Sequence, residues 1–385
     1  MRNLFRTDRA VIIVNSLLVN AGVERRTLDF AQFLLSRNLH VEVCALHHIG
    51  KIVPIFEQAG ITVRHIQVYK YNDARGDYSY FPLRFLRLIG YLLRNRFGLV
   101  FCVQPPSYII ARLACFPPLG RGIVAMERYI VRGRSKRRSA LDHWMAKWSH
   151  VVCVSTLLRE ELAAGADIPA AEIKVIEDGV TIAPPVSPQT ELRQRLTGRF
   201  VFGCVGLLTK RKRQALLIEA FADILRDPST KNRPALVLVG GGEDEDKLIQ
   251  LVAELELRDD VIFMGEQIHV HDFYPLFDCF VFPSVGEGLG NVWAEAMQHG
   301  LPVICADVRP MSDYIRHNET GLLARPDDPK AFAMEMRRLM DSETLRRDLG
   351  ARGKQFADDH FDGPRQMQKL LDSALESLNF SIRSK

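Results

Sequence analysis

The sequence lacks long apolar segments, paired cysteine motifs and low-complexity tracts. No apolar run approaches the roughly 18 residues that a membrane-spanning helix requires. The seven cysteines are odd in number, and none has a partner at Cys-x-x-Cys spacing. Most of them lie in apolar segments such as 40–46 and 151–155, which is typical of buried free thiols rather than of disulfides or a zinc site. We therefore predict a protein of the reducing cytoplasm.

The N-terminus has arginines followed by an apolar patch, as a signal peptide does. Asn15 and Ser16 interrupt that patch. Residues 10–16, the loop after them and residues 24–38 fit a strand, a turn and a helix instead. We expect this segment to belong to the fold.

The chain alternates short apolar segments with helical stretches. It has 385 residues, 47% of them hydrophobic and 25% charged, as expected for a globular protein of two domains. The apolar runs are continuous, so their strands should be covered on both faces, as in parallel sheets wrapped by helices. The predicted strands are 10–16, 40–46, 61–68, 99–104, 122–127, 150–155, 173–178, 200–206, 235–241, 261–266, 279–284 and 302–307.

A polar, proline-rich stretch at 179–198 divides this pattern. We predict an α/β fold with two doubly wound, Rossmann-like domains that face each other across a cleft. The predicted domains are 1–180 and 199–363, joined by a linker at 181–198 and followed by a helix at 364–385. Ligands of such sheets bind beyond the carboxyl ends of the strands.

The most informative segment is SVGEGLGNVWAEAMQHGLPVI, residues 284–304. It predicts the end of a strand, a glycine-rich turn and a helix that starts near residue 291. The glycines let the backbone approach a ligand closely, and the amides of residues 289–293 at the helix start favour an anion such as a diphosphate. We assign this role to Gly288, Leu289, Gly290, Asn291 and Val292.

Two glutamates, Glu287 and Glu295, frame that turn with seven residues between them. Because like charges repel, Glu287 should contact a neutral hydroxylated group rather than phosphate. Glu295 lies far enough into the helix to reach hydroxyls on the other side of the phosphates. A nucleotide sugar offers this order of groups. The alternative is that Glu287 is a solvated loop carboxylate and that Glu295 complements the helix dipole.

This segment resembles the E-x7-E signature of the retaining glycosyltransferases of family 4, which have the GT-B fold. Further similar segments follow in the family's order: NAGVERRTLDFAQFLLSRNLHVEV, VSTLLREEL, IKVIEDGVTI, VGLLTKRKRQALLIEAFADI, LVLVGGGEDEDKLIQLVAELEL and VIFMGEQIHVHDFYPLFDCFVFPS. The resemblance implies an N-terminal acceptor domain, a C-terminal nucleotide-sugar domain and a last helix that packs back on the first domain. It also implies that the departing phosphate oxygen takes the acceptor proton, so that no protein carboxylate need act as base.

The segment GLLTKRKRQ, residues 206–214, should hold the diphosphate at the mouth of the cleft. Relatives carry a basic residue directly after the glycine, here Gly206, and a lysine further on. Lys212 occupies the second place, but Leu207 stands in the first. Lys210, Arg211 or Arg213 are candidates to replace it, and a solvated basic turn is the alternative. Fixed positive charge here would stabilise the leaving diphosphate selectively in the transition state.

In the first domain, the resemblance makes Gly22 part of a loop that closes on the donor, with a plain tight turn as the alternative. Glu127 stands where many relatives have a histidine near the reacting sugar, and a carboxylate there can accept a proton or bind hydroxyls. We list Glu287, Lys212 and Glu127 as candidate catalytic residues. The segment 265–270 is a candidate for the base pocket.

The acidic string Asp244-Glu245-Asp246 resembles a metal-binding D-x-D motif. It should fall in the first turn of a helix, where acidic residues complement the dipole. We therefore expect no metal and no cofactor, only a nucleotide diphosphate-sugar as substrate.

Basic residues are concentrated in the first domain. Helical periodicity at 84–96 places Arg84, Arg87, Tyr91 and Arg94 on one face and Phe85, Ile89, Leu92 and Leu93 on another. With the basic cluster at 128–138, this face fits an anionic membrane surface and a lipid-linked acceptor. An ordinary amphipathic helix is the alternative. Nucleic acid is not expected, because few aromatic residues interleave with the basic ones.

These features predict a retaining glycosyltransferase that moves a sugar to a glycan or lipid-linked acceptor, in polysaccharide or lipopolysaccharide synthesis. Its predicted location is the cytoplasm, with peripheral attachment to the inner face of the plasma membrane. Two alternatives are a nucleotide-sugar epimerase of GT-B fold and a non-catalytic, membrane-associated assembly protein.

Overall fold

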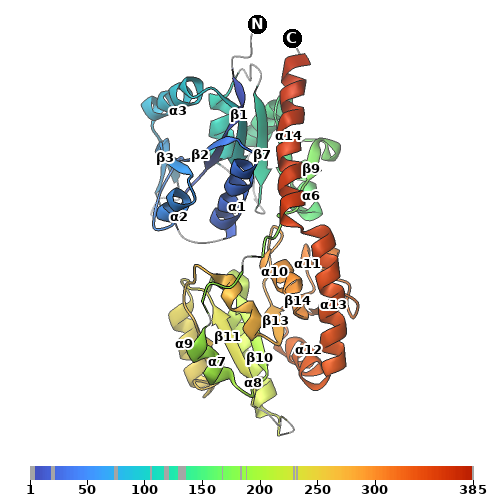
Figure 1. Cartoon of the computed structure of the whole chain (residues 1–385). Helices are drawn as coiled ribbons and strands as arrows, with labels where there is room; N and C mark the ends of the chain where they lie inside the picture. The colour runs from blue at the N-terminus through green and yellow to red at the C-terminus, as the bar shows by residue number, and fades with distance from the viewer. Residues whose placement is uncertain are drawn as a thin grey trace. The chain divides into compact units, whose positions relative to one another are not determined.

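The structure of the chain is a computed structural model. The structure describes residues 5–18, 22–72, 77–104, 106–116, 121–128, 136–166, 168–182, 184–187, 189–228, 230 and 233–383, without the side chains of residues 71, 72, 77, 78, 136–139, 166 and 379–383. It divides into two compact units, Met1–Gly179 with Gly363–Lys385, and Val180–Asp362 (Figure 1).

The first unit is built on a parallel sheet with strand order β3-β2-β1-β6-β7-β8-β9 and a separate antiparallel pair, β4-β5. The strands are β1 (Arg6–Val14), β2 (His40–Ala45), β3 (Thr62–His65), β4 (Tyr69–Asn72), β5 (Asp77–Tyr80), β6 (Phe97–Val103), β7 (Gly122–Glu127), β8 (His150–Cys153) and β9 (Ile173–Val175). The helices are α1 (Gly22–Ser36), α2 (Val53–Gln58), α3 (Pro82–Arg94), α4 (Ser107–Ala114), α5 (Lys136–Ala146), α6 (Thr156–Ala166) and α14 (Gly363–Arg383), with a 3-10 turn η1 (Ala170–Glu172).

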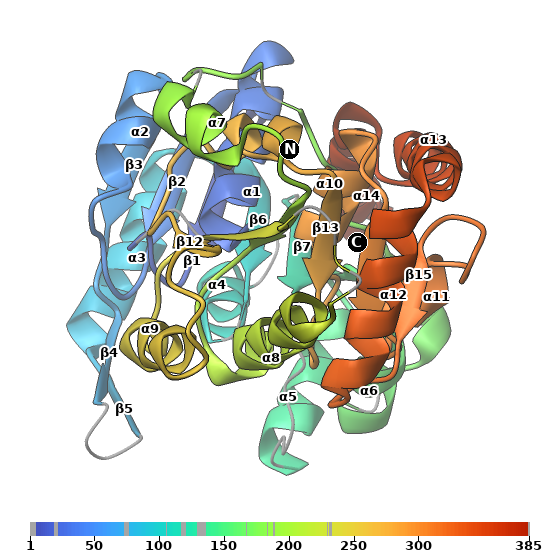
Figure 2. The same ribbon diagram turned by 90° about the horizontal axis from the view of Figure 1, so that it is seen from below.

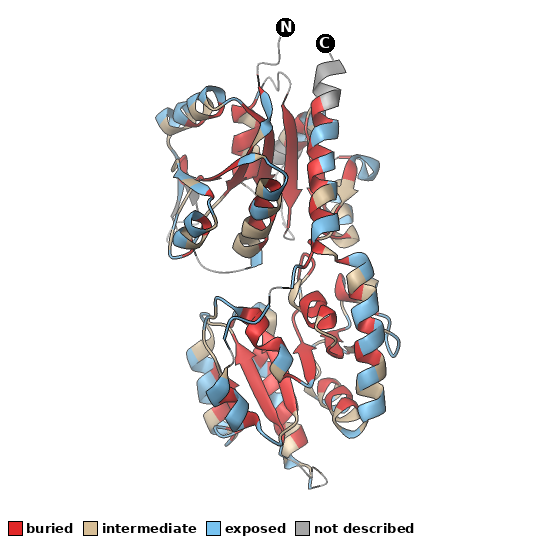
Figure 3. Ribbon diagram, viewed as in Figure 1, coloured by how far each residue is buried: buried red, intermediate tan, exposed pale blue. Residues whose placement is uncertain are grey.

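Helices cover both faces of this sheet, as the continuous apolar runs predict. On β1, Ala10, Ile12 and Val14 pack in one core cluster with residues of α1, α2 and α14. The alternate residues Val11 and Ile13 pack in another cluster with residues of α3 and α4. Figure 3 shows the central strands of both sheets almost wholly buried between outer helices that carry exposed residues, whereas the edge strand β3 is mostly exposed.

The last helix completes the first unit. In Figure 1, α14 runs beside β7, and Ser377 Oγ lies 3.2 Å from the carbonyl oxygen and 3.3 Å from the amide nitrogen of Ile123. A Cβ on Gly122 would lie 2.0 Å from the carbonyl oxygen of Ala374. Only glycine permits this approach, so the strand and the helix are matched to each other.

The second unit has a parallel sheet with strand order β12-β11-β10-β13-β14-β15. Its strands are β10 (Val201–Val205), β11 (Ala235–Val239), β12 (Val261–Phe263), β13 (Cys279–Phe282), β14 (Val303–Ala306) and β15 (Leu322–Ala324). Its helices are α7 (Thr190–Leu196), α8 (Gln214–Arg226), α9 (Glu245–Glu254), α10 (Val292–Gln298), α11 (Met311–Tyr314), α12 (Pro329–Asp341) and α13 (Glu343–His360), with 3-10 turns η2 (Lys210–Lys212), η3 (Val270–Asp272) and η4 (Tyr274–Leu276). Helices α8 and α12 lie side by side (Figure 2).

Each of the twelve predicted strands is present, and both units are doubly wound α/β structures. The sequence prediction missed β15 and the β4–β5 hairpin. The predicted linker 181–198 is not a bare connection, because it contains α7 and belongs to the second unit. Within the part of the chain that the structure describes, no helix is long and apolar enough to cross a bilayer. All seven cysteines are buried and free.

Candidate active site

The site follows from the order of the strands in the second unit. That order reverses between β10 and β13, which are neighbours in the sheet although β11 and β12 intervene in the chain. Such a reversal opens a crevice at the carboxyl ends of the strands, where ligands of doubly wound sheets bind. The segments that leave these two strands are 206–214 and 283–291, which carry the predicted residues.

The carboxylate of Glu287 joins the two segments. Its Oε1 lies 2.6 Å from Nη1 of Arg211 and 2.9 Å from Nζ of Lys212, and it also accepts a hydrogen bond from Ser284 Oγ. The side chains of Glu287 and Lys212 are only 8% and 12% exposed. Among the described residues, no hydrogen bond reaches the second oxygen, Oε2. The cluster thus fixes the direction in which this oxygen points.

Burial and charge act in opposite directions on Glu287. Burial raises the pKa of this carboxyl, but the charges of Lys212 and Arg211 and the hydrogen bond from Ser284 lower it, and the pKa ends below its ordinary value. Glu287 is therefore ionised at neutral pH. The burial of Glu287, which is 6% exposed as a whole residue, excludes the interpretation of it as a solvated loop carboxylate.

Lys212 is held in place by packing as well as by charge. Its Nζ lies 5.0 Å from the ring centroid of Phe282, the last residue of β13. A Cβ on Gly206 would lie 3.9 Å from Lys212 Cε, and Gly206 has φ +151°. A Cβ on Gly240 would lie 2.1 Å from the carbonyl oxygen of Gly206. The backbone of these two segments therefore packs too closely for a side chain at position 240.

Of the three candidates to replace the basic residue missing at position 207, Arg211 is the one that contacts Glu287. Its Nη1 also lies 3.2 Å from the carbonyl oxygen of Gly286 in the glycine turn. Arg213 instead caps α8 in a left-handed conformation and pairs with Asp327 at 2.9 Å. Lys210 and Arg213 line a different pocket, described below. Leu207 is 44% exposed.

The glycine turn leads into a short helix. Gly286 and Gly290 have positive φ values of 74° and 83°, and α10 begins at Val292 after Asn291. Gly288 and Leu289 are buried in this turn. The prediction that the amide of Trp293 points out of the helix start is wrong: it donates to the carbonyl of Gly290 at 3.3 Å. The indole of Trp293 donates to the carbonyl of Leu289, which ties the turn to the helix.

Glu295 lies inside α10 and is 3% exposed. The hydroxyl of Tyr274 donates to its Oε2 at 2.7 Å. A second tie follows one turn later, where His271 Nδ1 lies 3.1 Å from His299 Nε2. Burial lowers the pKa of His299, although the nearby Glu295 opposes this shift. Tyr274, His271, His299 and Ser284 all lie in segments that resemble the family, but the sequence assigned none of them a role.

The candidate base-pocket segment, 265–270, leaves β12 at the same edge of the sheet. The carbonyl of Gly265 accepts a hydrogen bond from the amide of Gly240 at 2.9 Å. Ile268 is 54% exposed. An apolar side chain on this edge is a suitable contact for a flat base.

Gly22 and Glu127 belong to the first unit. Gly22 is the first residue of α1, and a Cβ built on it meets no atom within 4 Å. Glu127 is the last residue of β7 and is 2% exposed, with the hydroxyl of Tyr108 3.3 Å from its Oε2. Its neighbour Arg128 is also buried and pairs with Asp178 at 2.9 Å. Arg128 is therefore not part of an exposed basic surface, contrary to the prediction.

The remainder of the basic cluster lies outside the described residues or has undescribed side chains. The prediction of a basic face and an apolar face on α3 is wrong in part. Arg84 is half-buried and its Nη1 lies 3.1 Å from the carbonyl of Gln67, while Tyr91 donates to Glu42 at 2.8 Å. Leu93, predicted on the apolar face, is 48% exposed. Arg87 and Arg94 are exposed as predicted.

The acidic string at 244–246 lies where the sequence predicts it. Asp244 caps α9, Glu245 and Asp246 occupy its first turn, and Asp244 pairs with Lys247 at 2.6 Å. The position of Asp244 at the start of the helix and its ion pair with Lys247 explain an acidic residue here.

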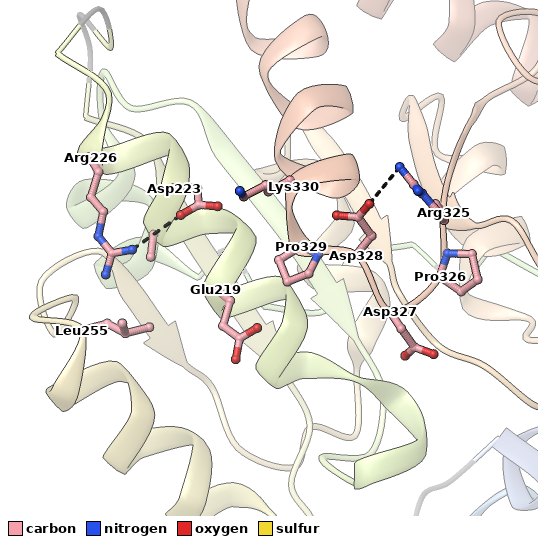
Figure 4. A pocket seen from close by; sticks show the side chains of 11 residues that line it. Glu219, Asp223, Arg226, Leu255, Arg325, Pro326, Asp327, Asp328, Pro329 and Lys330 are labelled. Carbon is pink, nitrogen blue, oxygen red and sulfur yellow. Dashed lines mark hydrogen bonds and ion pairs between the residues drawn. The ribbon is translucent and has the colours of Figure 1, made fainter.

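The second unit also has pockets away from the carboxylate cluster. One of about 540 Å³ lies among α8, the start of α12 and Leu255 (Figure 4). Two ion pairs lie among its lining residues, Arg226 with Asp223 at 3.5 Å and Arg325 with Asp328 at 3.1 Å. A neighbouring pocket of about 500 Å³ contains Lys210 and Arg213. Glu287, Glu295, Arg211 and Lys212 line neither pocket, so Lys210 and Arg213 lie apart from the carboxylate cluster.

Two parallel-sheet units, with a basic and acidic cluster at the reversal point of the second sheet, define a protein of the GT-B glycosyltransferase fold. The solved structure of HepE from Anabaena in complex with UDP is similar, with a TM-score of 0.78 and 20% identity over 95% of this chain and 100% of that one. The family profile "Glycosyl transferases group 1" matches residues 189–356, and "Glycosyltransferase Family 4" matches residues 20–183. The chain belongs to this family, the group 1 glycosyltransferases of family 4.

Curated relatives agree with this assignment over part of their length. N-acetyl-alpha-D-glucosaminyl L-malate synthase of Bacillus anthracis is 32% identical over 152 residues, 40% of this chain and 39% of the relative. The lipopolysaccharide core biosynthesis glycosyltransferase LpsD of Rhizobium meliloti is 35% identical over 173 residues, 45% of this chain and 48% of the relative. The matched region thus spans less than half the length of each of these relatives.

Proposed function

We propose that the protein transfers a sugar from a nucleotide diphosphate-sugar to a hydroxyl of a glycan or lipid-linked acceptor, with retention at the anomeric carbon. The observation that carries this proposal is the convergence of Glu287, Arg211 and Lys212 at the reversal point of the second sheet. Membership of the family supports sugar transfer. The complexes of HepE with UDP and with UDP-glucose support a nucleotide sugar as donor.

In this proposal the two oxygens of Glu287 have different tasks. Oε1 holds Arg211 and Lys212 in place, and Oε2 accepts a hydrogen bond from a hydroxyl of the donor sugar. The two cations and the glycine turn, with Gly288, Leu289, Gly290, Asn291 and Val292, contact the diphosphate. Glu295 accepts hydrogen bonds from the ribose hydroxyls. The diphosphate gains negative charge as the glycosidic bond breaks, so fixed cations stabilise the transition state more than the ground state.

The proton of the acceptor hydroxyl needs a destination. We propose that it passes to the departing phosphate oxygen on the same face of the sugar, so that the carboxylate of Glu287 orients the sugar and does not act as base. In the first unit, Gly22 and Glu127 are assigned to the loop over the donor and to the acceptor hydroxyls. The reaction as proposed uses no cofactor and no metal.

Direct binding measurements test this assignment. Glu295→Ala and Lys212→Ala should each weaken the binding of the nucleotide sugar about tenfold or more, since each removes a contact to a charged group. Calorimetry against a panel of UDP-, GDP- and ADP-sugars provides the measurement and identifies the base. Unchanged affinity in both variants would contradict the proposed donor site.

The same panel distinguishes the alternative functions. An epimerase of the same fold would convert the donor sugar without an acceptor, so incubation with donor alone should yield an epimer. A transferase yields free nucleoside diphosphate only when a hydroxylated acceptor is present. A non-catalytic assembly protein would not be stabilised by any nucleotide.

We also propose that α3 rests on an anionic membrane, where a lipid-linked acceptor is found. Leu83, Leu86 and Leu93 are 76%, 61% and 48% exposed. Their spacing places them on one face of the helix with the exposed Arg87 and Arg94. Exposed leucines flanked by arginines are typical of a helix that lies in the interface of an anionic bilayer. The name of LpsD also supports a role in lipopolysaccharide or polysaccharide synthesis.

Vesicle sedimentation tests this surface. The protein should bind vesicles that contain phosphatidylglycerol, and Leu83→Ser with Leu86→Ser should reduce binding at least fivefold, since burial of a leucine side chain contributes about 1.5–3 kcal/mol. Ile249→Ser in the second unit is the matched control, because Ile249 is 47% exposed on α9. Equal losses in both variants, or no binding by the wild type, would refute the proposal.

A further inference from the structure

Tyr274 contacts Glu295, the proposed ribose carboxylate, and the sequence assigned it no role. It is fully buried, and its hydroxyl donates to Glu295 Oε2 at 2.7 Å. Pinning one oxygen of a carboxylate fixes the orientation of the whole group, since the side chain then loses its freedom to rotate. The hydrogen bond from Tyr274 therefore determines which way the Glu295 carboxylate faces when a ligand binds.

Tyr274 is itself held rigidly. Its ring stacks on His299 with centroids 4.9 Å apart and an interplanar angle of 19°. His299 is in turn tied to His271 at 3.1 Å. Tyr274 contacts Glu295 of α10, and His271 contacts His299, the C-cap of the same helix. Glu295 and His299 are four positions apart. Residues four apart share one face of a helix, so the η3–η4 segment grips α10 along the face that carries Glu295.

The same segment is anchored at its other side. The carboxylate of Asp272 accepts hydrogen bonds from the amides of Val186 and Ser187 at 2.7 and 2.9 Å. Tyr274 also packs edge-on against Phe277 at 6.2 Å. The Tyr274 hydroxyl therefore has little room to follow Glu295 if the carboxylate moves, and it acts as a fixed reference point.

We infer that Tyr274 is a positioning residue for nucleotide recognition: its hydroxyl orients Glu295 so that the carboxylate selects nucleotides with a complete ribose over deoxynucleotides. The inference rests on the proposed contact between Glu295 and ribose. Tyr274 does not touch the reacting atoms. Its loss should raise KM for the donor and leave kcat within about twofold, because binding of the ribose is the same in the ground state and the transition state.

The test compares matched nucleotides in wild type and Tyr274→Phe. The probes are UDP, or whichever nucleoside diphosphate binds in the panel, and its 2′-deoxy and 3′-deoxy forms. The wild type should bind one deoxy form about tenfold more weakly, since a hydrogen bond to a charged group is lost. Tyr274→Phe should bind the ribonucleotide about tenfold more weakly than wild type and should discriminate little between the ribo and deoxy forms.

Tyr91→Phe is the matched control. It removes a bond of the same kind, from Tyr91 to Glu42 at 2.8 Å, in the first unit. The discrimination between ribo and deoxy nucleotides should be unchanged in this variant. If Tyr274→Phe does not fold, His299→Gln removes the stacked partner and should also reduce discrimination.

The outcomes separate the inference from the proposed function. If Glu295→Ala leaves nucleotide affinity unchanged, the proposed ribose contact is wrong and the inference is wrong with it. If Glu295→Ala weakens binding but Tyr274→Phe keeps the wild-type preference for ribose, only the inference is overturned. Equal weakening of ribo and deoxy forms by Tyr274→Phe also overturns it, because that result indicates a structural role alone.

Discussion

Replacing Glu287 with Gln should separate the two tasks of its carboxylate. The substitution keeps the shape and removes the negative charge between Arg211 and Lys212. Removing one partner of a buried ion pair costs about 3–5 kcal/mol, but Arg211 is 42% exposed and the Gln amide retains hydrogen bonds, so we expect about 2 kcal/mol. For a unit of this size the melting temperature should fall by about 4–8 °C.

The same variant should affect two ligands in opposite directions. A nucleoside diphosphate lacks the transferred sugar and so loses no hydrogen bond at Oε2, and the released cations should bind its phosphates as tightly as before or up to about threefold more tightly. A nucleotide sugar loses the hydrogen bond to Oε2 and should bind about tenfold to hundredfold more weakly. Lys212→Met, as a comparison, should weaken both ligands.

Calorimetry with the nucleoside diphosphate and its sugar form measures both effects, and thermal unfolding measures the loss of stability. A double-mutant cycle of Glu287→Gln with Lys212→Met should give a coupling energy of about 1–3 kcal/mol, as found for contacting residues. Equal weakening of both ligands by Glu287→Gln would show that Oε2 does not face the sugar. A coupling energy within error of zero would refute the ion pair.

Gly22→Ala should leave stability unchanged or raise it by about 0.5–1 kcal/mol, since the new Cβ meets no atom and alanine favours the helix. If a ligand approaches this backbone, kcat/KM should fall. Unchanged kcat/KM would contradict the assignment of Gly22 to the donor loop. Leu207→Arg should tighten nucleoside diphosphate binding about threefold to tenfold by adding a cation beside Lys212, with Leu207→Gln as the uncharged control. Burial raises the pKa of the Cys44, Cys153 and Cys204 thiols to about 12, so at pH 8.5 iodoacetamide should alkylate the native protein at least about a hundredfold more slowly than the unfolded chain. The native state retains these protons, so stability should also fall as the pH rises above about 9, and comparable alkylation rates in both states would contradict the burial.

The apolar runs predicted every strand of five or more residues in the two sheets because parallel strands buried on both faces need continuous hydrophobic sequence. They missed β15, whose apolar run ends with the strand at Ala324, whereas the runs of the equally short β9 and β12 continue to Ile176 and Met264. The prolines and polar residues at 181–198 suggested a linker, but α7 within it is amphipathic only over Leu192 and Leu196. Such a short apolar face gives almost no periodic signal.

In the candidate site too, some residues were predicted from the sequence and others were found only in the structure. The glycine-rich turn predicted the position of Glu287, because a turn between a strand and a helix is a local structure, and the family resemblance pointed to Lys212; the contact between them appears only in the fold. The faces of α3 were predicted poorly, since the long side chains of Arg84 and Tyr91 find polar partners inside the fold. Tyr274 and His299 became visible only in the structure, because folding brings together residues that are 25 positions apart.

The contribution of α14 to the first unit also determines when that unit can be completed during synthesis. Domains ordinarily fold in the order in which the ribosome produces them. Here Val180–Asp362 is made as one continuous stretch, whereas the sheet surface around Ile123 and Gly122 gains its covering helix only after that stretch has been translated. The second unit can therefore reach its native state while the first still exposes apolar surface, and a nascent chain halted before residue 363 would be a natural client for chaperones.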